Sequence, residues 1–521
     1  MQPIDQETRI KIMSQGGNII ISASAGTGKT HTTILKIKDD METNKSFSTF
    51  GAITFTKKAA KEIESKLQGD KREAFVGTND NFVLQEIIRP FMYDVYGREF
   101  KKEIKPDYST ANQIQDYDMG IKAIRDTGFL CKYADNKKNY SFQLALKILM
   151  ESEAARMYLI SKYYRIYIDE YQDCDKDMHN LFKYIYKDLS IPMFIVGDLK
   201  QSIYGWRGGY DKGFKDLLTD RDFTPFELKH NFRSVICIQN YANMFIDDVR
   251  ENFRKVPFDN SVHCFAYKQP FFAIKKIEEW IDEDEKCAFL IRNRLDGKKW
   301  AQWLQDNNVE FTYISSSPLD NSDMESEHIW IARQIAYYIL NDVYSEYDFY
   351  DEIPNADSYN FSNIRRMLFS IEKTADDMEM FNNNCSTLYE ILGYELSERT
   401  AKEIEVLFQV INDDEYIPTY NSEKYKHVIT TIHSAKGLQY KQVIVLAENY
   451  NLNILEDCNL HYVAVSRPEE KLLVLCNYRN SNGKAYCNAI KSNIQRIKKL
   501  GFDIEMRDVA VCFNSEEFKK D

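Results

Sequence analysis

The sequence predicts an α/β fold built from two parallel-sheet domains, and two observations support this. Short β-branched and aromatic runs have the composition of buried parallel strands. Segments with helical periodicity separate them; in Lys57–Leu67, for example, Ala60, Ile63 and Leu67 share one face. Strands alternating with helices are typical of parallel sheets. The predicted strands are residues 18–22, 52–55, 164–168, 193–196, 288–291, 443–446 and 472–475.

The length and composition limit the classes of protein that fit. The chain has 521 residues, a formal charge of −12, 44% hydrophobic and 28% charged residues, which is a globular composition. At about 100–200 residues per domain, it predicts three or four folded units. The acidic balance argues against a basic protein that coats nucleic acid, but a local basic groove would suffice for binding.

The lack of a recognisable targeting signal and the scattered cysteines predict a cytoplasmic enzyme with reduced thiols. No apolar run reaches the length of about 18 residues that a membrane span needs, so we expect no membrane partner. The N-terminus carries charge and lacks the apolar core of a signal peptide. The ten cysteines are scattered without a Cys-x-x-Cys pair. This spacing disfavours a zinc ribbon and a disulfide framework.

Two long, strand-poor helical stretches interrupt the strands and predict an insert in each domain. The first domain is expected at residues 1–82 and 160–236, with a helical insert at 83–159. The second is expected at 237–319 and 425–521, with a reduced helical insert at 320–424. Within the second insert, residues 341–360 hold six acids and no base. The favoured interpretation is a solvated acidic loop; the alternative is a surface that repels DNA or docks a basic partner.

A phosphate-binding loop follows the first predicted strand. Its small residues let backbone N–H groups turn toward phosphates, and the helix that begins there adds a favourable dipole. Lys29 would reach the β- and γ-phosphates of ATP, and the Thr30 hydroxyl would bind Mg²⁺. Ala23 replaces the first glycine of the usual pattern. The loop reads Ala23, Ser24, Ala25, Gly26, Thr27, Gly28, Lys29 and Thr30.

An acidic pair follows the predicted strand 164–168. A carboxylate at the tip of a neighbouring strand is where a phosphate-loop enzyme holds Mg²⁺, and Asp169 suits that role. The adjacent Glu170 can orient and deprotonate an attacking water. The alternative interpretation is an acidic helix N-terminus.

Further blocks occur in the order and at roughly the spacing of superfamily 1 helicases of the UvrD/Rep/PcrA type, which the chain resembles over about residues 4–475. The resemblance implies two RecA-like domains that enclose ATP and Mg²⁺ and step along DNA from 3′ to 5′. The blocks at 53–60, 169–173, 196–209, 228–234, 431–440 and 462–467 resemble motifs Ia, II, III, IV, V and VI.

The resemblance assigns roles around the γ-phosphate. Gln201 follows a strand end and can bond the γ-phosphate, while Arg233 and Arg467 are candidate arginine fingers. Surface arginines in ion pairs are the alternative for both. Gln6 is the candidate for the adenine-reading glutamine, although it lies about two residues farther from Lys29 than the family pattern. His433, Lys436 and Gly437 would couple nucleotide to DNA across the cleft. Gln439 stands where relatives usually carry Glu.

Candidate DNA contacts come partly from the residues themselves. Tyr204 and Trp206 lie two apart in a polar, Gly-rich segment, where exposed rings could stack on unpaired bases. Burial of both rings is the alternative. By resemblance, the other DNA-contacting residues are Phe55, Thr78, Arg207 and His433. The alternative for Phe55 is a core residue at the end of its strand. Asp80 replaces a histidine of the family pattern beside Thr78.

These patterns predict an ATP-dependent 3′–5′ DNA helicase or translocase acting on single strands and single-strand/duplex junctions. The alternative is a DNA-stimulated ATPase that acts as sensor or regulatory subunit beside a separate nuclease, in repair or anti-phage defence. Two further hypotheses about the function are disfavoured. Intact Lys29, Glu170 and Arg467 argue against a catalytically silent clamp, and the Tyr204 segment argues against an enzyme for small molecules.

Overall fold

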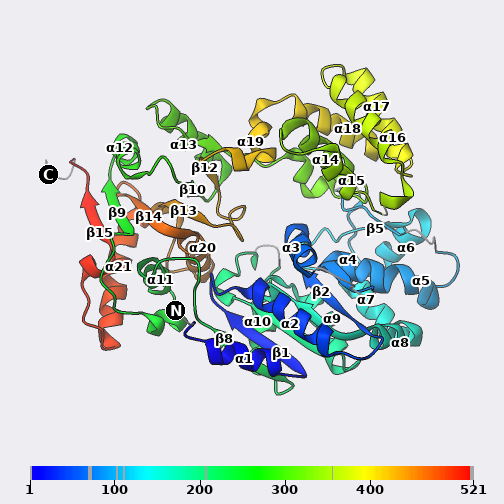
Figure 1. Cartoon of the computed structure of the whole chain (residues 1–521), viewed down its shortest axis with the longest axis horizontal. Coiled ribbons are helices and arrows are strands. Elements are labelled where there is room, and N and C mark those ends of the chain that lie inside the picture. Colours follow the sequence, from blue (N-terminus) through cyan, green and yellow to red (C-terminus); the bar gives the residue numbers. More distant parts are fainter. Residues whose placement is uncertain are drawn as a thin grey trace.

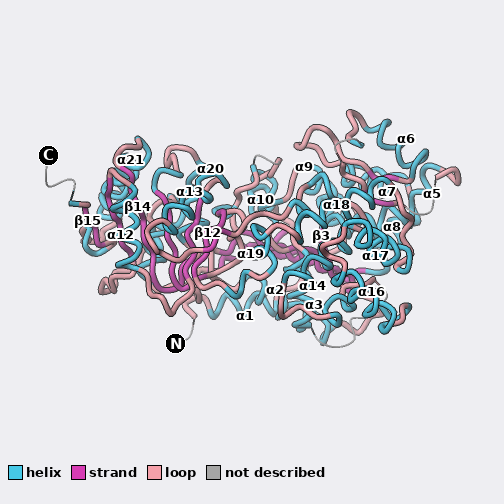
Figure 2. Tube along the Cα trace, turned by 90° about the horizontal axis from the view of Figure 1, so that it is seen from above, coloured by secondary structure: helices cyan, strands magenta, loops and turns pink. Residues whose placement is uncertain are grey.

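The computed structural model describes residues 3–67, 73–100, 104–109, 112–205, 208–354 and 356–516. Two large parallel sheets form the centres of two lobes, and helices surround them (Figure 1). Figure 2 shows the strands of both sheets in the interior, with helices outside them. The predicted α/β fold with two parallel sheets is therefore confirmed. Within the described residues, no helix is long and apolar enough to cross a membrane.

The first sheet has the strand order β3-β2-β6-β7-β1-β8, and all its neighbouring strands run parallel. The sequence predicted its four central strands but not β3 or β8. These two form the sheet edges, and β8 carries Pro225 and alternates buried with exposed residues, so neither is a continuous apolar run. The strands are β1 (Asn18–Ala23), β2 (Thr49–Thr54), β3 (Phe75–Thr78), β6 (Tyr163–Ile168), β7 (Met193–Gly197) and β8 (Phe223–Leu228).

The second sheet has the order β11-β12-β10-β13-β14-β9-β15 and is also parallel throughout. Its three predicted strands are β10, β13 and β14. The strands β9 and β12 were not predicted, because His263 and His427 interrupt their apolar pattern. The short edge strands β11 and β15 were not predicted either. The strands are β9 (Val262–Tyr267), β10 (Cys287–Ile291), β11 (Thr312–Tyr313), β12 (His427–Thr431), β13 (Tyr440–Leu446), β14 (Pro468–Asn477) and β15 (Val511–Asn514).

Helices connect the strands of both lobes, and the helix predicted at Lys57–Leu67 is present as α3. The first lobe contains α1 (Gln6–Ser14), α2 (Lys29–Thr43), α3 (Lys57–Leu67), α9 (Lys176–Lys187) and α10 (Asp211–Leu218). The second contains α11 (Ile236–Asn243), α12 (Pro270–Trp280), α13 (Arg294–Gln305), α20 (Leu455–Val465) and α21 (Ser481–Lys499).

The two predicted insert regions are mainly helical. The residues at which each insert begins and ends remain predictions. The first carries a π-helix at Leu84–Ile88 and a small sheet of β4 (Lys105–Pro106) and β5 (Phe129–Leu130). Its helices are α4 (Asn79–Val83), α5 (Arg89–Tyr96), α6 (Tyr117–Thr127), α7 (Tyr140–Glu151) and α8 (Glu153–Lys162). The second has a hydrophobic core of its own. Its helices are α14 (Ile329–Leu340), α15 (Glu346–Asp351), α16 (Phe361–Lys373), α17 (Met378–Ile391), α18 (Glu398–Ile411) and α19 (Ile417–Tyr420).

The acidic window of the second insert is not simply a solvated loop. Ser345 and Asp348 cap α15 reciprocally, and a Glu346 oxygen lies 2.8 Å from Arg365 Nε. Glu352 forms an ion pair with Lys61 of α3, in the first lobe. Helix capping and cationic partners from outside the window explain how a segment with six acids and no base forms ordered structure.

Candidate nucleotide and DNA site

The phosphate-binding loop joins β1 to α2, as its sequence pattern predicts. Gly26 and Gly28 have φ values of +72° and +76°, which L-residues with a Cβ rarely adopt. A Cβ at Gly26 would also lie 2.2 Å from Asn231 Oδ1 of the segment after β8. Ala23, by contrast, is the last residue of β1 and pairs in extended conformation with Leu228. An alanine therefore fits at the position where the usual pattern has glycine.

The two loop residues with functional side chains meet the acidic pair after β6. Because β1 and β6 run parallel in one sheet, their carboxyl ends lie at the same edge. The Thr30 hydroxyl donates to Asp169 Oδ2 at 2.8 Å, and Lys29 Nζ lies 3.1 Å from Glu170 Oε1. Lys29 Nζ is buried without a well-formed hydrogen bond among the described residues. Phosphate oxygens would supply the hydrogen bonds that this ion-paired ammonium does not make, so this edge fits a nucleotide.

Opposite charges hold the Lys29–Glu170 contact together. Burial opposes the charge on Lys29, yet the carboxylates of Glu170, Asp198 and Asp169 raise its pKa. Burial also opposes the Glu170 charge, but Lys29 and Lys436 lower the pKa of that carboxyl. Burial and the Glu170 charge raise the pKa of Asp169. Glu170 is therefore held in its ionised form, the protonation state that a proton acceptor needs.

The backbone of Glu170 is also unusual. Its φ of +56° places a non-glycine residue in the left-handed region, where residues at active sites are over-represented. Gln172 Nε2 donates to Glu170 Oε2 at 2.5 Å and fixes the second carboxylate oxygen. The side chain is thus oriented by Gln172 on one side and by Lys29 on the other.

The three residues predicted to sense the γ-phosphate lie at the boundary between the lobes. Arg467 Nη2 donates to Gln201 Oε1 at 3.2 Å, and Arg467 is 1% exposed. Arg233 Nη1 donates to the Ser466 carbonyl at 3.1 Å. Burial and the neighbouring Arg233 charge lower the pKa of Arg467 to about 9. Two guanidinium groups held this close favour binding of an anion between the lobes.

Further contacts across the boundary came from residues whose roles the sequence only partly indicated. Lys436 Nζ donates to Asp173 Oδ2 at 2.5 Å and to the Gln201 carbonyl at 3.0 Å. Asn459 Nδ2 of α20 donates to the carbonyls of Leu199 at 3.3 Å and Ser202 at 3.1 Å. Asn459 could not be predicted from the sequence, because its partners lie on the opposite lobe, 260 and 257 residues away along the chain.

Gln439, which departs from the family pattern, contacts a finger candidate. Its Oε1 accepts a hydrogen bond from Arg233 Nε at 3.1 Å. A neutral amide orients the guanidinium without neutralising its charge. Arg233 therefore remains available to a phosphate.

Helix α1 reaches the loop through residues that the sequence analysis missed. Arg9 Nη2 donates to the Thr27 carbonyl at 2.9 Å, and Arg9 Nε donates to Asp5 Oδ1 at 2.9 Å. The Arg9 guanidinium also lies 5.1 Å from the ring centre of Phe232, which is 58% exposed. An exposed ring beside the loop can stack on a base. Gln6 is the first residue of α1, one turn from Arg9.

The candidate DNA-contacting residues lie in different parts of the structure and have different neighbours. The Tyr204 ring lies 6.0 Å from the His433 ring and 4.8 Å from Lys436 Nζ, at the lobe boundary. Phe55 follows β2 and packs partly against the first-lobe core. The Thr78 hydroxyl accepts from the Asn81 backbone N–H at 3.4 Å and caps α4. Trp206 and Arg207 lie outside the described residues.

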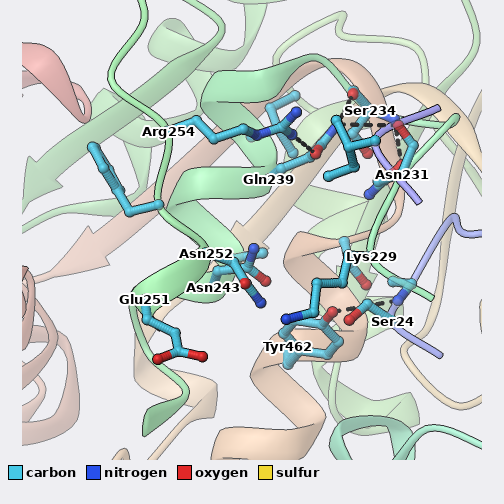
Figure 3. Close-up of a pocket in the computed structure, with 16 residues that line it drawn as sticks. Ser24, Lys229, Asn231, Ser234, Gln239, Asn243, Glu251, Asn252, Arg254 and Tyr462 are labelled. Carbon is cyan, nitrogen blue, oxygen red and sulfur yellow. Dashed lines mark hydrogen bonds between the residues drawn. The ribbon is translucent and has the colours of Figure 1, made fainter. Parts of the chain in front are cut away.

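A cavity of about 240 Å³ flanks the loop (Figure 3). Ser24 and Tyr462 come together on one side of it, and Asn243 and Asn252 lie on another. Lys29 is absent from its described lining, so the cavity is adjacent to the phosphate site rather than part of it. Residues from both lobes form its wall, so a molecule there would contact both.

The comparisons with known proteins agree with this geometry. Residues 6–207 match the family model described as an AAA domain, and residues 321–479 match the UvrD-like helicase C-terminal domain. The chain is 37% identical over 497 residues to the Gabija protein GajB of Bacillus cereus, spanning 94% of this chain and 98% of that protein. The chain belongs to the UvrD-like superfamily 1 helicase family.

Longer members of this family match only in part. The chain is 24% identical to the ATP-dependent DNA helicase PcrA of Staphylococcus aureus, over 60% of this chain and 48% of PcrA. It is 23% identical to the RecBCD enzyme subunit RecB of Buchnera aphidicola, over 67% of this chain and 38% of RecB. The alignments with this UvrD-like helicase thus cover less than half of the length of each of these two proteins.

Proposed function

We propose that this UvrD-like protein hydrolyses ATP to move along single-stranded DNA in the 3′ to 5′ direction. One observation carries the proposal: Lys29, Glu170 and Arg233 share the lobe boundary with Arg467 of the second lobe. Phosphoryl transfer requires this combination of a phosphate-binding lysine, a base for water and cationic charge on the transferring group.

The chain's own residues divide the work of hydrolysis. Lys29 and the loop N–H groups bind the triphosphate, and ionised Glu170 takes the proton of the attacking water. Arg233 and Arg467 stabilise the charge that develops on the γ-phosphoryl group. Thr30 and Asp169 would hold Mg²⁺, which neutralises phosphate charge when bound.

Gln201 connects the phosphate site to the candidate DNA-contacting residues. Its side chain accepts from Arg467, and its carbonyl accepts from Lys436, whose ammonium faces the Tyr204 ring. Loss of the γ-phosphate would therefore move groups that contact Tyr204. Bases stacked on Tyr204, and on Trp206 nearby in the chain, would then be gripped or released, at about 1–3 kcal/mol per base.

A second candidate is a DNA-stimulated ATPase that senses DNA within a complex containing a separate nuclease. The similarity to the Gabija protein GajB over nearly the whole chain favours this role. Compact UvrD-like proteins of this kind would serve in anti-phage defence, and the motor chemistry would be the same in both roles.

The deciding experiment measures ATP hydrolysis with and without short single-stranded DNA, then unwinding of duplexes with 3′ or 5′ tails. The translocase proposal expects DNA-stimulated hydrolysis and unwinding from the 3′ tail. Stimulation without unwinding, even with a candidate nuclease partner present, supports the sensor role instead. Hydrolysis that single-stranded DNA does not change contradicts both candidates.

A further inference from the structure

Four cysteine side chains come together in the second lobe, far from the nucleotide loop along the chain. Cys264 of β9 lies directly opposite Cys512 of the neighbouring parallel strand β15. Cys264 also lies opposite Val474 of β14, so Cys476, two positions further on, points to the same face of the sheet. The fourth cysteine, Cys487, belongs to α21, the helix that follows β14.

Helix α21 packs tightly against the end of β14. A Cβ at Gly483 would lie 2.3 Å from the Asn477 carbonyl oxygen, so only glycine allows this approach. Cys487 is four residues after Gly483 and lies on the same face of the helix. Cys476 and Cys487 belong to the same hydrophobic cluster of this lobe, and each thiol shifts the pKa of the other. Cys476 is fully buried, whereas Cys487 is partly exposed.

The groups around Cys487 favour its thiolate. The hydrogen bond from Cys476 lowers the pKa of Cys487 to about 7, against the effect of burial, and Tyr478 and Lys491 lower it further. The same hydrogen bond and burial raise the pKa of Cys476. The pair thus combines an accessible nucleophilic thiol with a buried one.

A chain of buried side chains connects this pair to the nucleotide site. Tyr486, the residue before Cys487, bonds His461 Nε2 through its hydroxyl at 2.5 Å. The same hydroxyl lies 2.9 Å from Tyr241 OH, which lies 3.6 Å from Cys264 Sγ. His461 belongs to α20, whose Asn459 bonds the opposite lobe and which ends just before Arg467.

We propose that Cys487 is a peroxide-reactive thiol that forms a reversible disulfide with Cys476. The Cys487 thiolate attacks one oxygen of hydrogen peroxide, the O–O bond breaks, and hydroxide leaves and takes up a proton as water. The Cys476 thiol then attacks the Cys487 sulfur; its proton and the sulfenic hydroxyl leave together as water. The two thiols lose two electrons to one peroxide, and low-molecular-weight thiols restore them. The disulfide would draw α21 toward β14 and displace Tyr486 from His461.

Peptide mapping tests the site itself, independently of ATP hydrolysis. Reduced full-length protein is treated with one equivalent of hydrogen peroxide, its remaining thiols are alkylated, and non-reduced peptides are mapped by mass spectrometry. The proposal expects a Cys476–Cys487 disulfide, which persists in Cys512→Ser, a change to the exposed cysteine of the same cluster. Cys476→Ala should instead leave a sulfenic acid at Cys487, trapped by a 1,3-dione. A Cys264–Cys512 disulfide formed first would overturn the proposal.

Two rate measurements complete the test. Alkylation of Cys487 by iodoacetamide should rise with pH and reach half its maximal rate near pH 7, because only the thiolate reacts. Peroxide should reduce DNA-stimulated ATP hydrolysis about five-fold, reversibly, and should not affect Cys487→Ser. A disulfide without that loss contradicts the connection to α20. A protein with no ATPase activity in either state contradicts the proposed function alone, because the mapping still decides the thiol site.

Discussion

At the residue scale, the ion pair between Lys29 and Glu170 gives the sharpest prediction. Glu170→Gln removes the base and the charge that pairs with Lys29, so hydrolysis should fall by about two or more orders of magnitude. Nucleotide binding should be kept or strengthened, because the Glu170 carboxylate no longer competes with phosphate for the Lys29 ammonium. Titration with a fluorescent ATP analogue, alongside steady-state turnover, measures both. Unchanged turnover would remove Glu170 from the chemistry.

Arg9 gives a second prediction at this scale. Arg9→Ala removes hydrogen bonds to Thr27 and Asp5 and the contact with the Phe232 ring. Charge-assisted hydrogen bonds contribute about 1.5–3 kcal/mol each, so the KM for ATP should rise at least about ten-fold. The exposed Lys11 on the same helix provides the matched control, as Lys11→Ala. Equal KM values for the two variants would show that α1 only packs against the loop.

At the element scale, the structure shows which features the sequence could predict. Central strands such as β1 and β7 are buried on both faces and read as unbroken apolar runs, so pattern alone located them. Edge strands such as β8 and β15 are half-exposed, and their pairing depends on a neighbour distant in sequence. The loop and the acidic pair were predictable because their chemistry is local. The contacts of Asn459 and Arg9 were not, because both depend on segments brought together only by folding.

The turn at Gly26 allows a prediction about how two elements approach each other. Gly26→Ala would place a Cβ in a backbone conformation with positive φ and against Asn231, on the segment that carries Arg233. Strain of about 1–3 kcal/mol should displace that segment and reduce ATP turnover strongly. Gly16→Ala is the matched control, because a Cβ there meets nothing within 4 Å. A G26A protein with normal turnover would show that the close approach is dispensable.

At the scale of the whole molecule, the two insert regions lie side by side and contact each other (Figure 1). Asp107 and Ser326 form a β-bridge, and Arg89 Nη2 lies 3.0 Å from Glu327 Oε1. The Lys61–Glu352 ion pair adds a contact from α3. Among the described residues, these polar contacts join the second insert to the first insert and to α3, and contacts of this kind weaken in salt.

The contacts between the two inserts predict that breaking one of them moves the inserts measurably apart. Arg89→Glu replaces attraction to Glu327 with repulsion, so the distance between dyes placed on α6 and α17 should increase, and the difference from the unaltered protein should shrink at high salt, which screens attraction and repulsion alike. Because partly exposed ion pairs are worth about 0–1 kcal/mol, the single change should shift the population rather than abolish the closed form. Adding Glu327→Arg should restore the energy transfer, since the reversed pair can form at the same place. If the double variant stays as open as Arg89→Glu, the ion pair does not hold the inserts together, and the β-bridge must account for the closure.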